Sequence, residues 1–321
     1  MPEAATDPPR DEANRIVKLN DVHVLLADTR AHIRNALKVA LAHSGLNNIH
    51  HASDVPHITD AMSHSFGPDI LICDMDMDDG ATSQIVTALR HNDLGRNPFL
   101  CIIGTSWMPT PAMVGLAADS GVDHLIAAPI APKEILDRIS SMVFNRAAFV
   151  VTADYVGPDR RTESNRPSHI PLSTVPNSLR EKAMGTWNFT EFERKIEDEV
   201  SRLNTRKIDR QAENIMALAD LIAAQTGDGA SAVIHHLVER LSRMVEAMDQ
   251  RAIEHGFNHV AELCRASVEI TQTIYRADGP PDENDVRLLR HMGQAIRVAL
   301  YPTEHAPEIA HEISKTVSAS R

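Results

Sequence analysis

Residues 68–74 read PDILICD, and residues 75–80 continue as MDMDDG. An apolar run between turn-forming residues predicts a strand that is covered on both faces, as the strands of parallel sheets are. Ligands of open parallel sheets bind beyond the carboxyl ends of the strands, where the strand order reverses. Asp74 closes this strand and opens an acidic loop that ends at Gly80, so Asp74 is the first candidate for a functional residue.

On both sides of this strand, the sequence alternates between strand patterns and helix patterns. Strand patterns cover residues 22–27, 48–51, 100–105 and 123–128. Helix patterns cover residues 31–43, 54–65, 81–91, 110–119 and 131–145. Strands and helices that alternate at this length predict an α/β fold with a parallel sheet and right-handed crossovers.

Short motifs stand at the ends of these predicted strands. Asp28 follows the first strand, and Ile33-Arg34 come five and six residues after it. Ser106 follows the fourth strand, and Pro129 follows the fifth. With these motifs in this order, residues 20–146 resemble the receiver domain of two-component response regulators, as in CheY-like proteins. The resemblance implies a doubly wound, five-stranded parallel sheet of the flavodoxin-like type, with a cis peptide bond before the proline.

The resemblance also implies roles for the residues at the strand ends. Asp74 stands at the phosphoacceptor, and Ser106 stands at the switch hydroxyl that moves toward the phosphoryl group. Mg²⁺ is the implied cofactor, because it prefers oxygen ligands; the implied ligands are Asp28, Asp74 and the backbone carbonyl of Asp76. The implied partner is a sensor histidine kinase or a phosphotransfer protein.

Two positions depart from the family pattern, so the receiver is atypical. Thr29 stands where the family has a second acid that binds Mg²⁺ directly, and Ala128 stands where it has a lysine that contacts the phosphoryl group. Losing that cation costs a phosphorylated Asp74 about 1.5–3 kcal/mol, the free energy of a charge-assisted hydrogen bond. Mg²⁺ binding is therefore expected to be weakened. Trp107, beside the switch hydroxyl, is expected to cover the site or to present a contact surface; the alternative is a tryptophan that merely packs on the surface.

Length and composition exclude several classes of protein. The chain has 321 residues, enough for two domains that each have a core. The net charge is −12 and both halves are acidic, so we expect no nucleic-acid partner. No apolar run approaches the ~18–20 residues of a membrane span, and the polar N-terminus is no signal or transit peptide. The three cysteines lack metal-ligand spacing, so we expect buried, reduced thiols in a cytoplasmic protein.

Two segments outside the predicted receiver are interpreted as irregular. Residues 1–19 are polar, and we expect a disordered arm. Residues 147–188 are interpreted as a linker, because prolines interrupt helices and ladders. The prolines that carry this prediction are Pro167, Pro171 and Pro176. Tyr155 and the arginines Arg160, Arg161 and Arg166 are expected to dock the linker onto an acidic domain face; the alternative is that the arginines bind the phosphate of a nucleotide.

Residues 189–321 predict an all-α domain. Apolar residues recur mostly at spacings of three and four in residues 189–225, 231–254, 258–276 and 282–300, and a shorter helix is expected at 306–318. Amphipathic helices joined by short turns pack as a bundle. Asn188 offers an N-cap to the first helix, which would be about 55 Å long. That helix is either a signalling stalk or dimer helix, or it breaks near Asn204.

The resemblance predicts a response-regulator-type signal transduction protein. A partner kinase would phosphorylate Asp74, and this change would control what the helical domain binds, whether a partner protein or a second copy of the chain. A phosphorylation-independent pseudo-receiver that works as an adaptor or scaffold is the alternative. A phosphotransfer role of the bundle through His235 or His236 is a third hypothesis. No signature of a cyclase, hydrolase or ATPase appears, so we expect no enzyme activity.

Overall fold

The computed structural model describes residues 18–63, 67–152, 154–161, 171–225, 230–277 and 281–300. Almost all of the predicted arm at residues 1–19, and the predicted helix at 306–318, lie outside these ranges. Contacts between residues divide the chain into two compact units. The first unit comprises residues up to 150 together with 155–199, and the second comprises 151–154 together with the residues from 200 onward.

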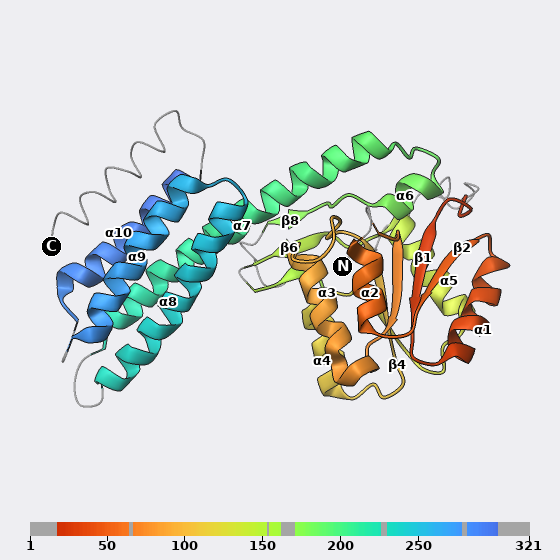
Figure 1. The fold of residues 1–321 in the computed structure, drawn as a ribbon, viewed down its shortest axis with the longest axis horizontal. Helices are drawn as coiled ribbons and strands as arrows, with labels where there is room; N and C mark the ends of the chain where they lie inside the picture. The colour runs from red at the N-terminus through yellow and green to blue at the C-terminus, as the bar shows by residue number, and fades with distance from the viewer. Residues whose placement is uncertain are drawn as a thin grey trace, which may run out of the picture. The chain divides into compact units, whose positions relative to one another are not determined.

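A five-stranded sheet forms the centre of the first unit (Figure 1). Its strands are β1 (His23–Ala27), β2 (Asn48–Ala52), β3 (Ile70–Asp74), β4 (Cys101–Ser106) and β5 (His124–Ala127). All neighbouring strands are parallel, and their order is β2-β1-β3-β4-β5. The predicted five-stranded parallel α/β fold is therefore confirmed.

Helices cover both faces of this sheet. They are α1 (Ala31–Ala42), α2 (Val55–Ser63), α3 (Ala81–His91), α4 (Pro111–Ser120) and α5 (Pro132–Phe144), with a short 3₁₀ helix η1 at Met77–Gly80. One hydrophobic core lies between the sheet and helices α1 and α5, and we call it the α1/α5 core. A second core, the α2–α4 core, lies on the other face. This arrangement is the doubly wound one.

Strand β3 shows why the central strand reads as an unbroken apolar run. Ile70 and Ile72 enter the α1/α5 core, whereas Leu71 and Cys73 enter the α2–α4 core. Successive side chains of a strand point to opposite faces, so a strand between two cores is apolar throughout. Full burial of each large aliphatic side chain contributes about 1.5–3 kcal/mol. This burial holds Asp74 at a fixed point at the edge of the sheet.

The prediction of a linker without regular structure is wrong for the described part of residues 147–188. The segment contains β6 (Phe149–Val151), β7 (Val156–Pro158), β8 (Leu172–Ser173) and helix α6 (Ser178–Ala183). The three strands form a small sheet in the order β7-β6-β8. Prolines fit this arrangement, because Pro158 lies on an edge strand and Pro171 directly precedes one. Pro167 lies outside the described residues.

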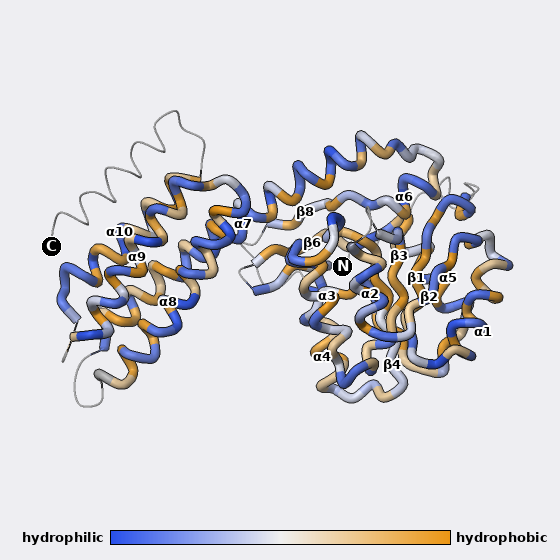
Figure 2. The backbone as a smooth tube through the Cα atoms, in the orientation of Figure 1, coloured by the Kyte–Doolittle hydropathy of each residue, from blue (hydrophilic) through white to orange (hydrophobic). Residues whose placement is uncertain are grey.

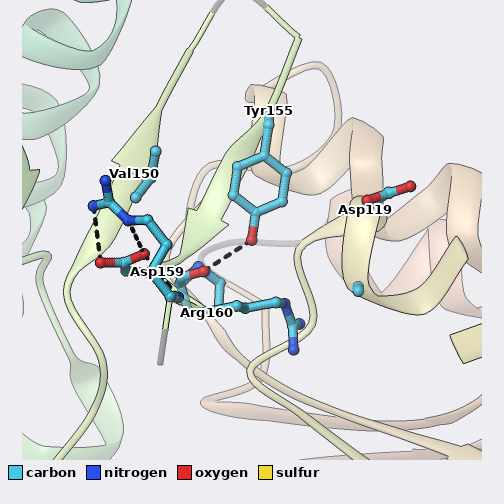
Figure 3. A pocket seen from close by; sticks show the side chains of 8 residues that line it. Asp119, Val150, Tyr155, Asp159 and Arg160 are labelled. Atoms are coloured by element: carbon cyan, nitrogen blue, oxygen red, sulfur yellow. Dashed lines mark hydrogen bonds and ion pairs between the residues drawn. The ribbon is translucent and has the colours of Figure 1, made fainter. Parts of the chain in front are cut away.

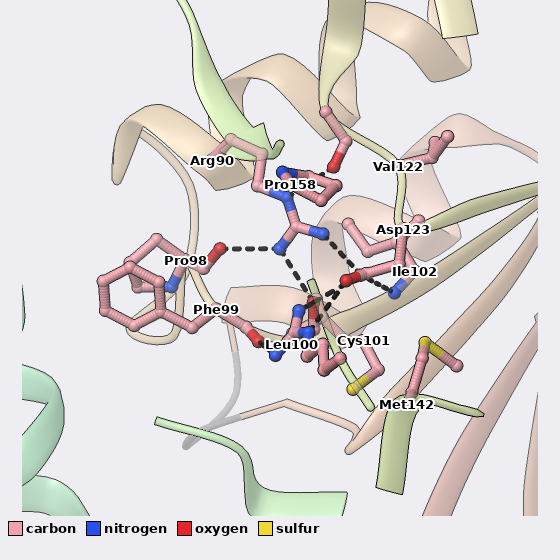
Figure 4. Close-up of polar contacts among 12 residues, drawn as sticks. Arg90, Pro98, Phe99, Leu100, Cys101, Ile102, Val122, Asp123, Met142 and Pro158 are labelled. Atoms are coloured by element: carbon pink, nitrogen blue, oxygen red, sulfur yellow. Dashed lines mark hydrogen bonds and ion pairs between the residues drawn. The ribbon is translucent and has the colours of Figure 1, made fainter. Parts of the chain in front are cut away.

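A buried ionic network joins the domain of the five-stranded sheet to this small sheet (Figure 4). Both Arg90 and Arg146 pair with Asp123, at 2.9 and 2.8 Å. Their guanidinium groups lie 5.1 and 5.0 Å from the ring centre of Phe149 in β6. Burial alone would raise the pKa of Asp123, but the two guanidinium groups outweigh it and lower that pKa. The carboxylate therefore stays charged inside the protein.

The helices of the second unit share one hydrophobic core. They are α7 (Phe189–Ala223), of which residues from Val200 onward belong to this unit, α8 (Ala230–Glu254), α9 (Asn258–Arg276) and α10 (Glu283–Ala299). These bounds match the predicted helices closely, and the interpretation with a break near Asn204 is wrong. Asn188 caps α7 as predicted, since its Oδ1 accepts the Glu191 N–H at 3.0 Å. Hydrophobic and hydrophilic stretches alternate along these helices, as amphipathic helices require (Figure 2).

None of the helices within the described ranges is both long and apolar enough to span a lipid bilayer.

Candidate functional site

The carboxyl ends of three neighbouring strands bring the predicted site residues together. Asp28 directly follows β1, Asp74 ends β3, and Ser106 ends β4. Because β3 pairs in parallel with both β1 and β4, these three ends meet at one edge of the sheet. The residues Asp28 and Asp74 are only 5% and 4% exposed, and Ser106 is fully buried. Two carboxylates are thus held side by side with little solvent around them.

Arg30 connects the two carboxylates. Its Nε and Nη2 donate to the two carboxylate oxygens of Asp28, each at 2.8 Å. The same Nη2 also donates to Oδ2 of Asp74 at 2.6 Å. The backbone N–H of Arg30 donates to Asp28 at 2.7 Å, which fixes the start of the loop. The fork of an arginine matches a carboxylate bidentately, so this pair is both strong and directional.

Trp107 covers Arg30 from the other side. The guanidinium carbon lies 4.3 Å from the centre of the indole ring, which is a cation–π arrangement. Trp107 itself is 38% exposed, so it separates the charged pair from part of the solvent. A second arginine, Arg34, donates to the backbone carbonyl of Asp28. The prediction that Trp107 covers the site agrees with this contact.

Asp76 directs its carboxylate toward β4. Its oxygens accept the hydroxyl of Ser106 at 3.0 Å and the backbone N–H groups of Trp107 and Met108 at 2.6 and 3.1 Å. The backbone N–H of Asp76 donates to Oδ1 of Asp74 at 3.1 Å. Ser106 therefore bonds to Asp76 in this structure, and Asp74 is held by Arg30 and by the peptide group two residues after it.

The environment of Asp74 changes its acidity. Burial raises the pKa of Asp74 to about 6, and the nearby Asp28 carboxylate also raises it. The N–H of Asp76 and the charge of Arg30 act in the opposite direction. Hydrogen bonding to Asp28 raises the pKa of Arg30, which stays charged. Asp74 is therefore mostly ionised at neutral pH, as a nucleophilic carboxylate must be.

The two carboxylates implied as Mg²⁺ ligands, Asp28 and Asp74, are engaged by a cation of the protein itself. Within the described ranges, no group of three His, Cys, Asp or Glu side chains is placed to hold a metal ion. Asp28 and Asp74 both pair with Arg30, and the Asp76 carboxylate faces β4. Thr29 has no carboxylate to offer. Mg²⁺ is usually held by one or two carboxylates and several waters, so an incoming ion would have to displace Arg30 from Asp28 and Asp74.

Other sequence-based expectations concern the fifth strand and the cysteines. The Ala128–Pro129 peptide bond is cis, as the resemblance implied. All three cysteines are buried and reduced, which confirms that prediction. Burial raises the thiol pKa values of Cys73 and Cys101 to about 12. These thiols are neutral at physiological pH and are no candidates for redox chemistry.

Three of the residues expected to dock the linker, Tyr155, Arg160 and Arg161, line a cavity of about 360 Å³ beside β6 and β7 (Figure 3). Arg166 lies outside the described residues. Arg160 donates to the backbone carbonyl of Val122 at 2.5 Å, so it does contact the receiver. Arg161 instead pairs with Asp159 in its own segment at 2.7 Å, and the hydroxyl of Tyr155 donates to the Pro158 carbonyl at 3.0 Å. The cavity therefore shows no pair of arginines arranged for a phosphate.

The histidines of α8 were the candidates for phosphotransfer. Nε2 of His235 lies 3.1 Å from the carbonyl oxygen of Tyr275, and the two rings meet edge-on. A carbonyl only accepts hydrogen bonds, so Nε2 carries the proton in this arrangement and has no lone pair for attack. His236 is exposed. The contact of His235 favours an ordinary structural role.

Arg30 is the site residue that sequence reasoning missed. The signal was a basic residue two positions after the acid that ends the first strand. Nothing in the sequence says that this side chain turns back over the strand ends, because that direction is set by Asp28, Asp74 and Trp107 together.

Several solved structures are similar to the chain over 37–40% of its length. They include the chemotaxis protein CheY4 of Vibrio cholerae, with 19% identity over 37% of this chain and 96% of that chain, and a TM-score of 0.33. A signal receiver domain of a two-component histidine kinase from Clostridium thermocellum has 18% identity over 38% of this chain and 96% of its own, with a TM-score of 0.34.

A third similar structure is a response regulator protein from Burkholderia pseudomallei, determined with a phosphorylated aspartic acid, a calcium ion and citrate. It has 16% identity over 40% of this chain and 77% of its own, with a TM-score of 0.33. No curated protein matches the chain. The family model of the response regulator receiver domain matches residues 24–140. On this match, residues 24–140 are a response regulator receiver domain.

Proposed function

We propose that the chain is a signal transduction protein whose Asp74 accepts a phosphoryl group from the phosphohistidine of a sensor kinase or phosphotransfer protein. The observation that carries the proposal is the position of Asp74. It is a buried carboxylate at the carboxyl end of the central strand of a receiver domain. A receiver domain in general takes part in response-regulator signalling, so a donor protein of this class is the expected partner.

The proposed transfer balances as a simple displacement. A carboxylate oxygen of Asp74 attacks phosphorus, the new P–O bond forms, and the P–N bond to the donor imidazole breaks. The imidazole leaves and takes a proton from solvent. Phosphoryl transfer depends mainly on positioning and on cancelling the charge of the transferred oxygens. The N–H of Asp76 positions Oδ1 of the nucleophile, and Arg30 supplies a positive charge beside Oδ2.

We further propose that phosphorylation changes the surface around β4 and α4. In the phosphorylated state, Ser106 would leave Asp76 and donate to a phosphoryl oxygen. That exchange would loosen the turn at Trp107 and Met108, whose N–H groups bond to the same Asp76 carboxylate. The altered surface would bias what the helical unit binds, whether another protein or a second copy of the chain.

Intact-mass measurement after incubation with acetyl phosphate tests the transfer. We expect wild type to gain the mass of one phosphoryl group, and Asp74→Asn to gain none. Asp79→Asn is the matched control, because Asp79 is an exposed acid of the same loop whose left-handed backbone (φ 52°) asparagine tolerates. Equal results for wild type and Asp74→Asn would contradict the proposal.

The second candidate function is a pseudo-receiver that acts as an adaptor without phosphorylation. The pairing of Arg30 with Asp74 favours it, because a nucleophile that already holds an ion pair is less available. Ala128, in place of the family's lysine, favours it as well. If no donor labels Asp74, while the full chain still binds a partner equally well as wild type and as Asp74→Asn, the adaptor function is supported.

A further inference from the structure

The guanidinium group of Arg30 is enclosed on three sides by groups that attract cations. Asp28 holds it by two hydrogen bonds at 2.8 Å, Asp74 by one at 2.6 Å, and the ring of Trp107 lies 4.3 Å away. The side chain of Arg30 is 29% exposed, whereas those of Asp28 and Asp74 are 7% and 5% exposed. The guanidinium group of Arg30 thus lies between the two buried carboxylates and the protein surface.

Two neighbouring buried carboxylates need a positive charge. Each would otherwise lose its hydration without a compensating partner, and the two would repel each other. In this chain, Arg30 meets that need for both. The carboxylate of Asp76 adds no demand for a cation, because one hydroxyl and two N–H groups already donate to it; the ligand implied at Asp76 is its backbone carbonyl.

We propose that Arg30 is the resident cation of this pocket and stands in place of a divalent metal ion between Asp28 and Asp74. The inference goes beyond the phosphotransfer proposed above, because it concerns the cation of the pocket and holds whether or not Asp74 is phosphorylated.

Arg30 has two advantages over a metal ion from solution. It is attached only two residues after Asp28, so its effective concentration at the pocket is high. Its planar fork also satisfies one carboxylate bidentately and stacks on an indole, which a hydrated ion cannot do. Thr29 contributes to the same outcome, since it leaves an incoming ion one carboxylate fewer. A metal ion would have to displace a held guanidinium group and then bind without the carboxylate that position 29 lacks.

Titration with Mn²⁺, followed by the loss of the free Mn²⁺ signal in electron paramagnetic resonance, tests the inference directly. We expect wild type and Asp74→Asn to bind Mn²⁺ equally, through surface acids only. Arg30→Ala is expected to gain a site at least about tenfold tighter than any in wild type. Arg30→Ala combined with Asp74→Asn is expected to lose that site again.

The control for the change in net charge is Arg138→Ala on α5. Arg138 is partly exposed and pairs with Glu134, away from the carboxyl ends of the strands. The variant Arg138→Ala should bind Mn²⁺ as wild type does. A Mn²⁺ site that is present in wild type and absent in Asp74→Asn would overturn the inference. This comparison tests the inference even if Arg30→Ala does not fold.

Phosphorylation provides a second readout and separates the two proposals. If acetyl phosphate labels wild type, the labelling should be unchanged when Mg²⁺ is replaced by a chelator. Labelling that requires Mg²⁺ would overturn the role of Arg30 and leave the function of Asp74 intact. Absence of labelling under both conditions would count against that function, while the Mn²⁺ titration still decides the role of Arg30.

Discussion

Arg30 is expected to contribute to stability as well as to the charge of the site. Replacing it with alanine leaves two buried carboxylates without their shared donor. Because charge-assisted hydrogen bonds contribute about 1.5–3 kcal/mol, Arg30→Ala should lower the free energy of unfolding by about that amount at neutral pH. Urea denaturation followed by tryptophan fluorescence measures it. Arg138→Ala, which breaks a surface pair, should change stability by less than about 0.5 kcal/mol.

Because of His124, we expect the free energy of unfolding to fall in mild acid. Burial lowers its pKa from the ordinary value of 6.5, and Arg138 and Arg160 nearby lower it further, against the opposing charge of Asp123. The unfolded chain therefore binds a proton more readily than the folded one, and stability falls as the pH drops below 6.5. His124→Gln should flatten this decline in urea denaturation at a series of pH values. An unchanged decline would contradict the assignment.

Individual side chains show where sequence reasoning succeeds and where it ends. The positions of Asp28, Asp74 and Ser106 could be predicted, because a parallel sheet places the carboxyl ends of its strands at one edge. The hydrogen bonds that these side chains make could not be predicted. Whether Ser106 bonds to Asp76 or to Asp74 depends on rotamers that respond to neighbours from three strands. Arg30 was overlooked for the same reason.

Strands β6 and β7 depend on the buried network of Arg90, Asp123 and Arg146. Asp123 accepts from both arginines and from the N–H of Ile102, so its removal leaves two buried cations unpaired. We expect Asp123→Ala to lower the free energy of unfolding by about 3–5 kcal/mol, as breaking buried ion pairs does. Urea denaturation provides the measurement. Asp119→Ala, at an exposed position on α4, is the control and should be nearly neutral.

The elements of the receiver and the long helices could be predicted to within a few residues. Their hydrophobic patterns extend over enough residues to show a period. The small sheet could not be predicted, because β6, β7 and β8 contain only two or three residues each and show no period. Prolines misled the prediction as well. Pro158 lies on an edge strand, where a missing N–H costs no ladder bond.

Taken together, the two units have separate hydrophobic cores, so a change in one core should leave the other intact. Leu263 is fully buried in the core of the second unit. Leu263→Ala should cost about 2–5 kcal/mol there. Both tryptophans, Trp107 and Trp187, belong to the first unit. In Leu263→Ala, the unfolding of the second unit, followed by circular dichroism, should therefore move to a lower temperature. The unfolding midpoint measured by tryptophan fluorescence should stay the same as in wild type. A common shift of both signals would show that the two units unfold as one.

The distribution of thiols offers a way to follow this behaviour without introducing any new residue. Cys73 lies in the α2–α4 core, Cys101 in the α1/α5 core and Cys264 in the core of the helical unit. A buried neutral thiol does not react with an alkylating reagent until its surroundings open. Pulsed alkylation and peptide mapping would therefore record the opening of each core separately. Each of the three hydrophobic cores of the described residues contains one thiol, whose rate of alkylation reports how often that core opens.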